Sequence, residues 1–279
     1  MGWLINFLRK NIESIAKNNT FKLKVGGFFI TLTLIIISGL VGYTIEQLTF
    51  SEVIILKYIG LITIIITLAS TIAYKSLFDS VIDILESLRE NYSHENLESA
   101  RIKLRQIVGR NVDNLDKQEI LRATAESASE NSVDGVFAPI FWIVIGIILW
   151  KYSTSFPGPL ALALIFKASS TLDSMLGYKE GKLLWLGYAS AKLDDLLTWI
   201  PCRIVVMTLP LVTKNWSSTP MIIKKAWIDG SKDESPNSGL SEAIFAHCFQ
   251  IRMGGLNKYS QGIKEKSILA KHAPEATNT

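Results

Sequence analysis

The chain has 279 residues, 48% of them hydrophobic, and its formal net charge is +4 at pH 7. Because this charge is modest, we expect no nucleic-acid partner. The two cysteines give no disulfide framework, and the three histidines (His94, His247 and His272) show no zinc-type spacing to one another or to a cysteine. Composition therefore argues against a zinc protein and against a disulfide-rich domain.

The N-terminal part of the chain contains two uncharged apolar segments. Residues 25–45 contain no charged residue, and residues 58–73 form a second such run. Each approaches the roughly 20 apolar residues that a membrane-spanning helix needs. Lysines and arginines precede the first run and follow the second. Between the runs, residues 44–56 carry Glu46 and Glu52 and no basic residue, and Lys57 lies at the edge of the second run. The positive-inside rule therefore predicts a transmembrane hairpin in a multi-pass protein of the cell membrane, with the N-terminus in the cytoplasm.

The remaining segments predict an all-α polytopic membrane protein with a single membrane-embedded domain over residues 1–279. Residues 75–122 have helical apolar spacing and many charges, typical of a cytoplasmic helical insertion. Residues 123–213 hold three apolar runs that are short or broken by proline, which indicates short, kinked or re-entrant helices around a cytoplasm-facing site. Residues 214–279 are polar and are expected to form a cytoplasmic loop and tail, disordered after Lys264.

Three acids lie directly before the first of these three apolar runs, residues 136–150. Glu126, Glu130 and Asp134 recur every fourth residue, so a helix would place them on one face, with Ser127 and Asn131 beside them. Stacked carboxylates repel one another by a few tenths of a kcal/mol per pair. A magnesium ion that carries a phosphorylated substrate would relieve this repulsion. The alternative is ion pairing with nearby arginines, for which Arg110 and Arg122 are the candidates.

Two further acidic groups follow. Asp173 lies among small polar residues, and Asp194 and Asp195 are adjacent at the start of an apolar run. Adjacent residues diverge by about 100° on a helix, so only one of that pair can face a given ligand. The alternative for the pair is favourable charge near a helix N-terminus, which contributes under about 1 kcal/mol.

Two turns near the C-terminal end have features of anion sites. Residues 235–239 (Ser-Pro-Asn-Ser-Gly) precede Glu242 on a predicted helix, and Ser235 and Asn237 either shape a turn or present amides to a phosphate. Arg252 precedes a tight turn at Gly254 and Gly255, where backbone can approach an anion closely. An ion pair between Arg252 and Glu242 or another acid is the alternative.

Read in order, these motifs resemble those of the adenosylcobinamide-phosphate synthase family, called CobD or CbiB. The matching stretches run from residue 108 to residue 256: Val108–Arg110, Glu126–Ser127, Glu130–Asn131, Val133–Gly135, Ala138–Pro139, Phe141–Trp142, Thr171–Met175, Gly177–Tyr178, Leu193–Leu197, Pro201, Ser235–Asn237, Gly239 and Gly254–Gly255. Ser170 and Asn111-Val112 depart from the family pattern. The chain begins at Met1, where the family commonly has a further apolar segment and a His-Pro element, so we expect an upstream segment to be missing.

The resemblance implies ATP-dependent joining of cobyric acid to (R)-1-aminopropan-2-ol O-phosphate or a related amino alcohol phosphate, with Mg²⁺. The implied partners are a corrinoid, the lipid bilayer and other enzymes of cobalamin biosynthesis. The sequence leaves open which amino alcohol phosphate is used. The residues expected to serve catalysis are Glu126, Glu130, Asp134, Asp173, Asp194 and Asp195, the first three of them as magnesium ligands. Those expected to contact substrate or phosphate are Arg110, Ser127, Asn131, Tyr178, Ser235, Asn237 and Arg252.

Two other classes of protein suit acids in a helical membrane protein. A magnesium-dependent membrane prenyltransferase needs Asp-x-x-Asp or Asp-x-x-x-Asp elements in two helices, and Asp194-Asp195 has no such continuation. A non-enzymatic transporter predicts internal repeats and clean spans, and the sequence shows neither. The synthase is therefore the favoured prediction, with Glu126, Asp173, Asp194 and Asn237 expected to meet at the cytoplasmic face.

Overall fold

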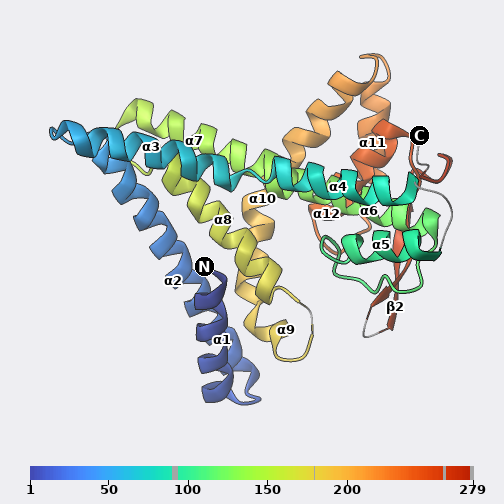
Figure 1. Cartoon of the computed structure of the whole chain (residues 1–279), viewed down its shortest axis with the longest axis horizontal. Helices are drawn as coiled ribbons and strands as arrows, with labels where there is room; N and C mark the ends of the chain where they lie inside the picture. Colours follow the sequence, from blue (N-terminus) through green and yellow to red (C-terminus); the bar gives the residue numbers. More distant parts are fainter. Residues whose placement is uncertain (90–93, 179, 260–261, 277–279) are drawn as a thin grey trace. The chain divides into compact units, whose positions relative to one another are not determined.

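The computed structural model describes residues 1–89, 94–178, 180–259 and 262–276 (Figure 1). This part of the chain is mostly helical, which confirms the predicted all-α class, with one added β-hairpin. In chain order the elements are α1 (Gly2–Ala16), α2 (Thr20–Leu48), α3 (Ile54–Thr71), α4 (Tyr74–Arg89), α5 (His94–Leu104), α6 (Lys117–Ser132), the π-helix η1 (Val133–Phe137), α7 (Ala138–Tyr152), α8 (Pro159–Leu176), α9 (Leu183–Leu186), α10 (Tyr188–Thr213), α11 (Thr219–Gly230), α12 (Ser238–Phe249), β1 (Met253–Tyr259) and β2 (Gly262–Leu269).

The chain divides into two compact units, whereas the sequence predicts one domain. Unit 1 comprises residues 1–72 and 137–198, and unit 2 comprises residues 73–136 and 199–279. The division near residue 198 falls inside α10, and the one near residue 136 falls inside η1. Because both positions lie within continuous helical structure, no break in composition marks them.

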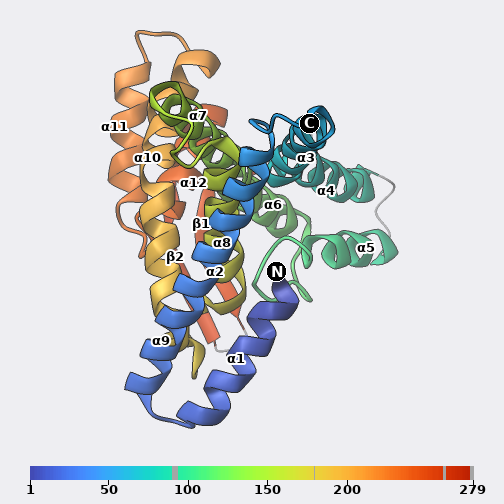
Figure 2. The same ribbon diagram turned by 90° about the vertical axis from the view of Figure 1, so that its left-hand side faces the viewer.

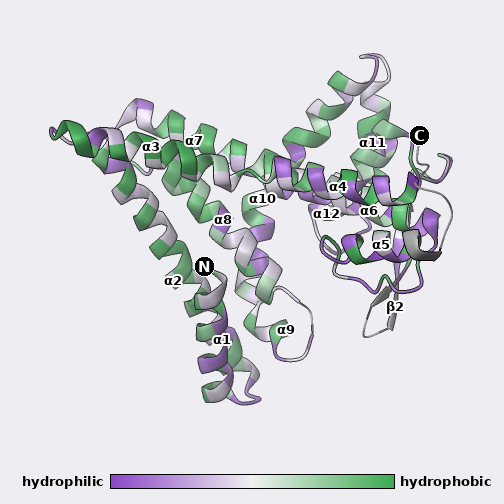
Figure 3. Cartoon of the chain, viewed as in Figure 1, coloured by the Kyte–Doolittle hydropathy of each residue, from purple (hydrophilic) through white to green (hydrophobic). Residues whose placement is uncertain are grey.

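Unit 1 contains the predicted membrane hairpin, formed by α2 and α3. Large apolar side chains on both helices are exposed, as expected for a lipid-facing surface, and Figure 3 shows both helices as mostly hydrophobic. By length and composition, four helical segments of the described chain could cross a membrane: Thr20–Leu48, Ile54–Arg89, Lys117–Tyr152 and Tyr188–Thr213. The chain is a helical multi-pass membrane protein.

The same unit contains a buried carboxylate that the sequence places in a loop. Helix α2 continues to Leu48, so Glu46 lies inside the helix and is fully buried. Its carboxylate accepts hydrogen bonds from the backbone N–H groups of Gly158 (2.9 Å), Leu160 (2.6 Å) and Ala161 (3.0 Å). These groups begin α8, whose first N–H groups have no partner within the helix. Glu46 therefore fixes the start of α8 against α2. The ribbons of these two helices lie side by side (Figure 2).

Helices between residues 123 and 213 follow the predicted short or broken pattern only in part. A break at Pro157 and Gly158 precedes α8, as predicted, but α10 runs for 26 residues through Pro201 and Pro210. Pro201 has no N–H to donate to the carbonyl of Leu197. The indole N–H of Trp142 donates to that carbonyl instead, at 3.1 Å. A substitute donor of this kind lets a helix continue through proline.

Unit 2 overturns the expectation of a loop and tail over residues 214–279. Helices α11 and α12 pack against each other, and β1 and β2 pair in antiparallel register from Tyr259↔Gly262 to Met253↔Leu269. The register is irregular between Met253 and Gly255. Gly254 and Gly255 have φ angles of +83° and +95° there, which glycine adopts at little cost. This irregularity turns backbone groups of β1 toward α6.

Candidate functional site

Helix α6 carries the acids around which the site of unit 2 is built. A capping box begins the helix: the Asp116 carboxylate accepts from the Glu119 N–H at 2.8 Å, and the Glu119 carboxylate accepts from the Asp116 N–H at 3.0 Å. One side of α6 packs into a core that includes Ile120, Leu121 and Ala123. Glu126 and Glu130 follow one turn apart, as the sequence predicts.

Glu126 is held by two arginines and a backbone amide. Its Oε2 lies 2.9 Å from Arg110 Nη1, and its Oε1 accepts the N–H of Gly254 at 2.8 Å. Arg122 Nε lies 3.9 Å from Oε1, and the Arg122 guanidinium also donates to the carbonyls of Gly254 (2.5 Å) and Leu256 (3.1 Å). Ion pairing with Arg110 and Arg122 is therefore what the structure shows for this carboxylate.

Arg110 is a buried guanidinium with unused donors. It is 8% exposed, and its Nη1 also donates to the side-chain oxygen of Asn257 on β1. Its Nε and Nη2 atoms are buried and have no hydrogen-bond partner among the described residues. A buried donor left unpaired costs about 1–3 kcal/mol. These two atoms are therefore suited to receive an acceptor atom of a ligand.

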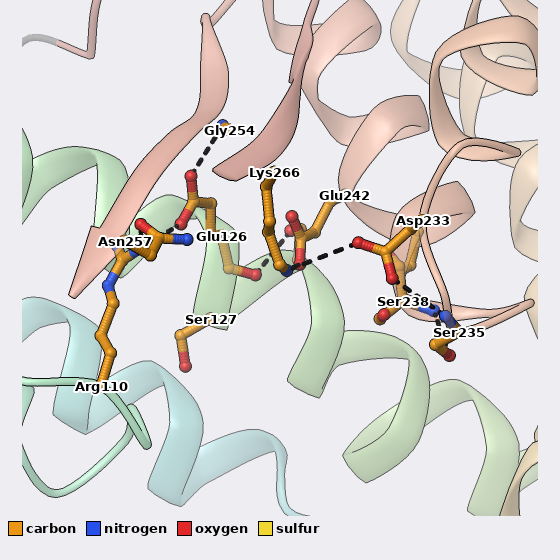
Figure 4. Close-up of polar contacts among 12 residues, drawn as sticks. Arg110, Glu126, Ser127, Asp233, Ser235, Ser238, Glu242, Gly254, Asn257 and Lys266 are labelled. Atoms are coloured by element: carbon orange, nitrogen blue, oxygen red, sulfur yellow. Dashed lines mark hydrogen bonds and ion pairs between the residues drawn. The ribbon is translucent and has the colours of Figure 1, made fainter. Parts of the chain in front are cut away.

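Lys266 on β2 forms a second ion pair of the site. Its Nζ lies 2.7 Å from Glu242 Oε1 on α12 and 3.9 Å from Asp233 Oδ2. Figure 4 shows the ammonium between these two carboxylates, and Glu126 reaching Gly254 and the Arg110–Asn257 pair. Lys266 therefore places a positive charge beside an acid of α12 and an acid of the turn between α11 and α12.

Burial and charge set the protonation of this pair. Burial raises the pKa of the Glu242 carboxyl to about 8, although the Lys266 ammonium acts in the opposite direction. Burial would lower the pKa of Lys266, but the attraction of Glu242 and Glu130 outweighs it and raises that pKa above the usual range. Lys266 is therefore the partner that stays charged, and Glu242 is the group that exchanges a proton near neutral pH.

The loop at residues 235–239 is held by an arginine of α10. Arg203 donates to the Asn237 side-chain oxygen at 2.5 Å and to the Pro236 carbonyl at 2.9 Å. The Ser235 hydroxyl accepts from the N–H groups of Asn237 and Ser238, each at 3.3 Å. Asn237 is 6% exposed, and its side chain does not cap α12. Its contact with an anion stays a prediction.

A cavity of about 120 Å³ lies in unit 2 between the ion pairs of Glu126 and Lys266. We call it the α6 cavity. Its polar lining brings together six positions that the sequence singles out and two that it does not. The lining residues are Ile107, Val108, Gly109, Arg110, Ala123, Glu126, Ser127, Glu130, Asn131, Glu242, Asn257 and Lys266. The Asn131 amide donates to the Ser127 carbonyl at 2.9 Å, which orders the polar face of α6.

Other predicted residues lie elsewhere. Asp134 is in η1 and is not among the residues that line the α6 cavity. Asp173, Tyr178, Asp194 and Asp195 belong to unit 1. Their predicted meeting with the acids of unit 2 stays a prediction.

Arg252 borders a second hollow in unit 2, with a volume of about 400 Å³. Arg122, Gly254 and Gly255 line the same hollow. The Arg252 guanidinium is paired with Glu275, an acid other than the Glu242 considered from the sequence. Its predicted contact with a phosphate stays a prediction.

The surroundings of the predicted magnesium ligands can be compared with those of a metal site. Within the residues described, no group of three or more His, Cys, Asp or Glu side chains is placed to hold a metal ion. Glu126 is committed to Arg110 and the Gly254 amide, so the repulsion that motivated a metal is relieved by cations. The magnesium role of Glu126, Glu130 and Asp134 together stays a prediction.

Lys266, Asn257 and Arg203 are site residues that the sequence did not reveal. Lys266 sits in the run Lys264-Glu265-Lys266, which resembles a solvated charged segment. Its partner Glu242 is 24 residues away, and Asn257 is 147 residues from Arg110. Contacts between residues so far apart in the sequence leave no local sequence pattern from which they could be predicted. Arg203 carried a weak signal, as the only charged residue of residues 196–213.

Together, the fold and the site define a multi-pass helical membrane protein with a charge-lined cavity. Comparison with known proteins then places it: the family described as CobD/Cbib protein matches residues 1–279, and the chain belongs to this family. The resemblance inferred from the motifs is thereby confirmed.

Several curated relatives are named "Cobalamin biosynthesis protein CobD". The protein from Synechocystis sp. is 40% identical over 96% of this chain and 74% of its own length. Those from Yersinia enterocolitica and Leptospira interrogans are 35% and 34% identical over 93% and 94% of this chain, and over 76% and 78% of their own lengths. No solved structure matches the chain.

Proposed function

We propose that this protein is an adenosylcobinamide-phosphate synthase of cobalamin biosynthesis, a carbon–nitrogen ligase. It joins the free propionate of adenosylcobyric acid to the amine of (R)-1-aminopropan-2-ol O-phosphate or a related amino alcohol phosphate. One observation carries the proposal: in a chain that belongs to the CobD/Cbib family, the motif residues Arg110, Glu126 and Glu130 line one cavity, and Glu126 accepts the N–H of the motif glycine Gly254.

Amide formation from a carboxylate requires an activating group. A propionate oxygen attacks a phosphorus of ATP, and ADP or diphosphate leaves, which gives a mixed anhydride. The amine nitrogen then attacks the carbonyl carbon, and phosphate or AMP leaves with that propionate oxygen. The substrate ammonium loses two protons, one before its nitrogen attacks and one as the amide forms. A departing phosphate takes up one of them and the other is released as H⁺, whereas both are released when AMP leaves. The protein must hold two anionic substrates and accept a proton.

The charged groups of unit 2 suit these tasks. Glu242 lines the α6 cavity, and its pKa near 8 suits a base that takes a proton from an ammonium at neutral pH. The hollow beside Arg252 suits the ATP phosphates, since both Arg122 and Arg252 line it and guanidinium groups bind phosphate oxygens. Mg²⁺ enters as part of the MgATP substrate.

We place the reaction at the cytoplasmic face of the cell membrane, with the N-terminus in the cytoplasm. ATP is cytoplasmic, and the charge distribution around α2 and α3 follows the positive-inside rule. A large amphipathic corrinoid suits a protein that is partly in lipid. Enzymes that supply the corrinoid or use the product are the partners to test.

The test is product formation by the purified full chain in lipid nanodiscs. With ATP, Mg²⁺, adenosylcobyric acid and the amino alcohol phosphate, mass spectrometry should show a product lighter than the sum of the two joined substrates by one water. Omission of ATP should abolish it. Asp173→Asn should lower the yield at least about 10-fold, and so should one of Asp194→Asn and Asp195→Asn, because only one of these adjacent acids can face the substrate. Absence of the product from wild-type protein would reject the proposal.

A further inference from the structure

The α6 cavity contains unsatisfied hydrogen-bonding groups of both kinds. Arg110 is more than nine-tenths buried and lines the cavity, and its Nε and Nη2 have no acceptor in the part of the chain that the structure describes. Glu130 lines the same cavity, and no described residue donates a hydrogen bond to its carboxylate. The cavity therefore presents two unused donors and one unused acidic acceptor.

The neighbouring charges are already paired with each other. Glu126 is bound to Arg110 Nη1 and the Gly254 amide, and Glu242 is bound to Lys266 at 2.7 Å. Glu130 feels the attraction of the Lys266 ammonium, but among the described residues it has no hydrogen bond or ion pair of its own. A ligand that satisfies both sides needs an anionic oxygen for Arg110 and a cationic N–H for Glu130.

We propose that the α6 cavity is the subsite for the amino alcohol phosphate, with its phosphate monoester on Arg110 and its ammonium on Glu130. This assignment rests on the proposed function and adds the location and chemistry of one substrate. The volume of about 120 Å³ agrees with it. Pockets that enclose drug-sized ligands measure roughly 300–1,000 Å³, so a nucleotide or a corrinoid would not fit within this space.

The same charges predict which amino alcohol phosphate is preferred. Glu126, Glu130 and Glu242 all line the cavity, so an additional carboxylate on the ligand would face three acids. Threonine phosphate carries such a carboxylate, whereas aminopropanol phosphate and ethanolamine phosphate do not. Like charges in a partly buried site repel strongly because water screens them poorly. We therefore expect threonine phosphate to bind at least about 10-fold more weakly than aminopropanol phosphate.

Direct binding to the full chain in nanodiscs tests the assignment without turnover. Calorimetric titration would compare aminopropanol phosphate with propanediol phosphate, which lacks the amine, and with aminopropanol, which lacks the phosphate. The variants are Glu130→Gln and Arg110→Lys, and Glu265→Gln is the matched control because Glu265 is an exposed neighbour of Lys266. Glycerophosphoethanolamine represents a lipid headgroup, a phosphodiester of otherwise similar chemistry.

The expected result is a pattern across ligands. Glu130→Gln should weaken aminopropanol phosphate at least about 10-fold and leave propanediol phosphate unchanged, because only the first ligand has an ammonium. Arg110→Lys should weaken both phosphates, because lysine lacks the guanidinium's Nε–H and Nη2–H₂ donors. Glu265→Gln should change neither. Equal effects of Glu130→Gln on both phosphates, or no binding to wild type, would overturn the proposal.

Three further outcomes complete the test and separate this proposal from the proposed function. Diester binding as tight as monoester binding would assign the cavity to a lipid headgroup and overturn the subsite. Formation of the amide product without the expected ligand pattern would overturn the subsite and keep the synthase. The ligand pattern without any ATP-dependent amide product would keep the subsite and reject the synthase.

Discussion

At the scale of single residues, the Glu242–Lys266 pair sets the protonation of the site. The pair is buried, and its lysine lies on a strand whose register with β1 fixes its position. Glu242 binds its proton more tightly in the folded protein than in an unfolded chain, where a glutamate has a pKa near 4.5. Protein stability should therefore depend on pH through this residue.

The sign of that dependence follows from the raised pKa. The stabilising contribution is fully present below pH 4.5 and is lost as the pH rises through about 8, because the unfolded chain releases the proton first. Thermal unfolding in detergent between pH 5 and 8 should show a falling melting temperature for wild type and a smaller fall for Glu242→Gln. Identical slopes for the two proteins would show that Glu242 titrates normally.

Arg252 provides a test of the ATP phosphate site. A charge-assisted arginine–phosphate contact contributes roughly 1.5–3 kcal/mol, so Arg252→Ala should raise the KM for ATP by about 10- to 100-fold. Glu275→Gln removes the partner of Arg252 and should leave that KM within a few-fold of wild type. If both variants lower thermal stability alike and neither changes a KM, Arg252 serves only its ion pair.

At the scale of elements, Glu46 links two helices of unit 1. Three N–H groups at the start of α8 depend on one carboxylate from α2. Hydrogen bonds to a charged group contribute about 1.5–3 kcal/mol each, so Glu46→Ala should lower the free energy of unfolding by at least about 3 kcal/mol. Glu52→Ala, an exposed acid six residues further on, is the control. Equal melting temperatures for the two variants would contradict this role.

The elements that the sequence predicts well are those with a local signal. The apolar runs give α2 and α3, and the four-residue spacing of Glu126 and Glu130 gives the acidic face of α6. The β-hairpin was missed because Lys264, Glu265 and Lys266 read as a solvated tail, and its register depends on the distant pair Met253 and Leu269. Likewise, no spacing indicates that Arg110 meets Asn257 or that Trp142 compensates for Pro201.

At the scale of the whole molecule, the side of the membrane on which the site opens can be measured. Cys202 and Cys248 are buried, so after their replacement a single cysteine can be labelled in intact cells. Ser231→Cys is on an exposed turn after α11, and we expect an impermeant reagent to reach it only from the cytoplasmic side. Glu52→Cys, between α2 and α3, should react from outside. Labelling of Ser231→Cys from outside alone would place the loop at residues 235–239 away from ATP.

The central claim is that ATP activates the propionate of the corrinoid before the amine attacks. Adenosylcobyric acid with ¹⁸O in that carboxylate tests it most directly. For each amide formed, we expect one ¹⁸O atom in inorganic phosphate or AMP and one in the amide carbonyl, read by mass spectrometry of both products. Release of the departing ¹⁸O into water, with none in a phosphorus-containing product, would contradict the claim.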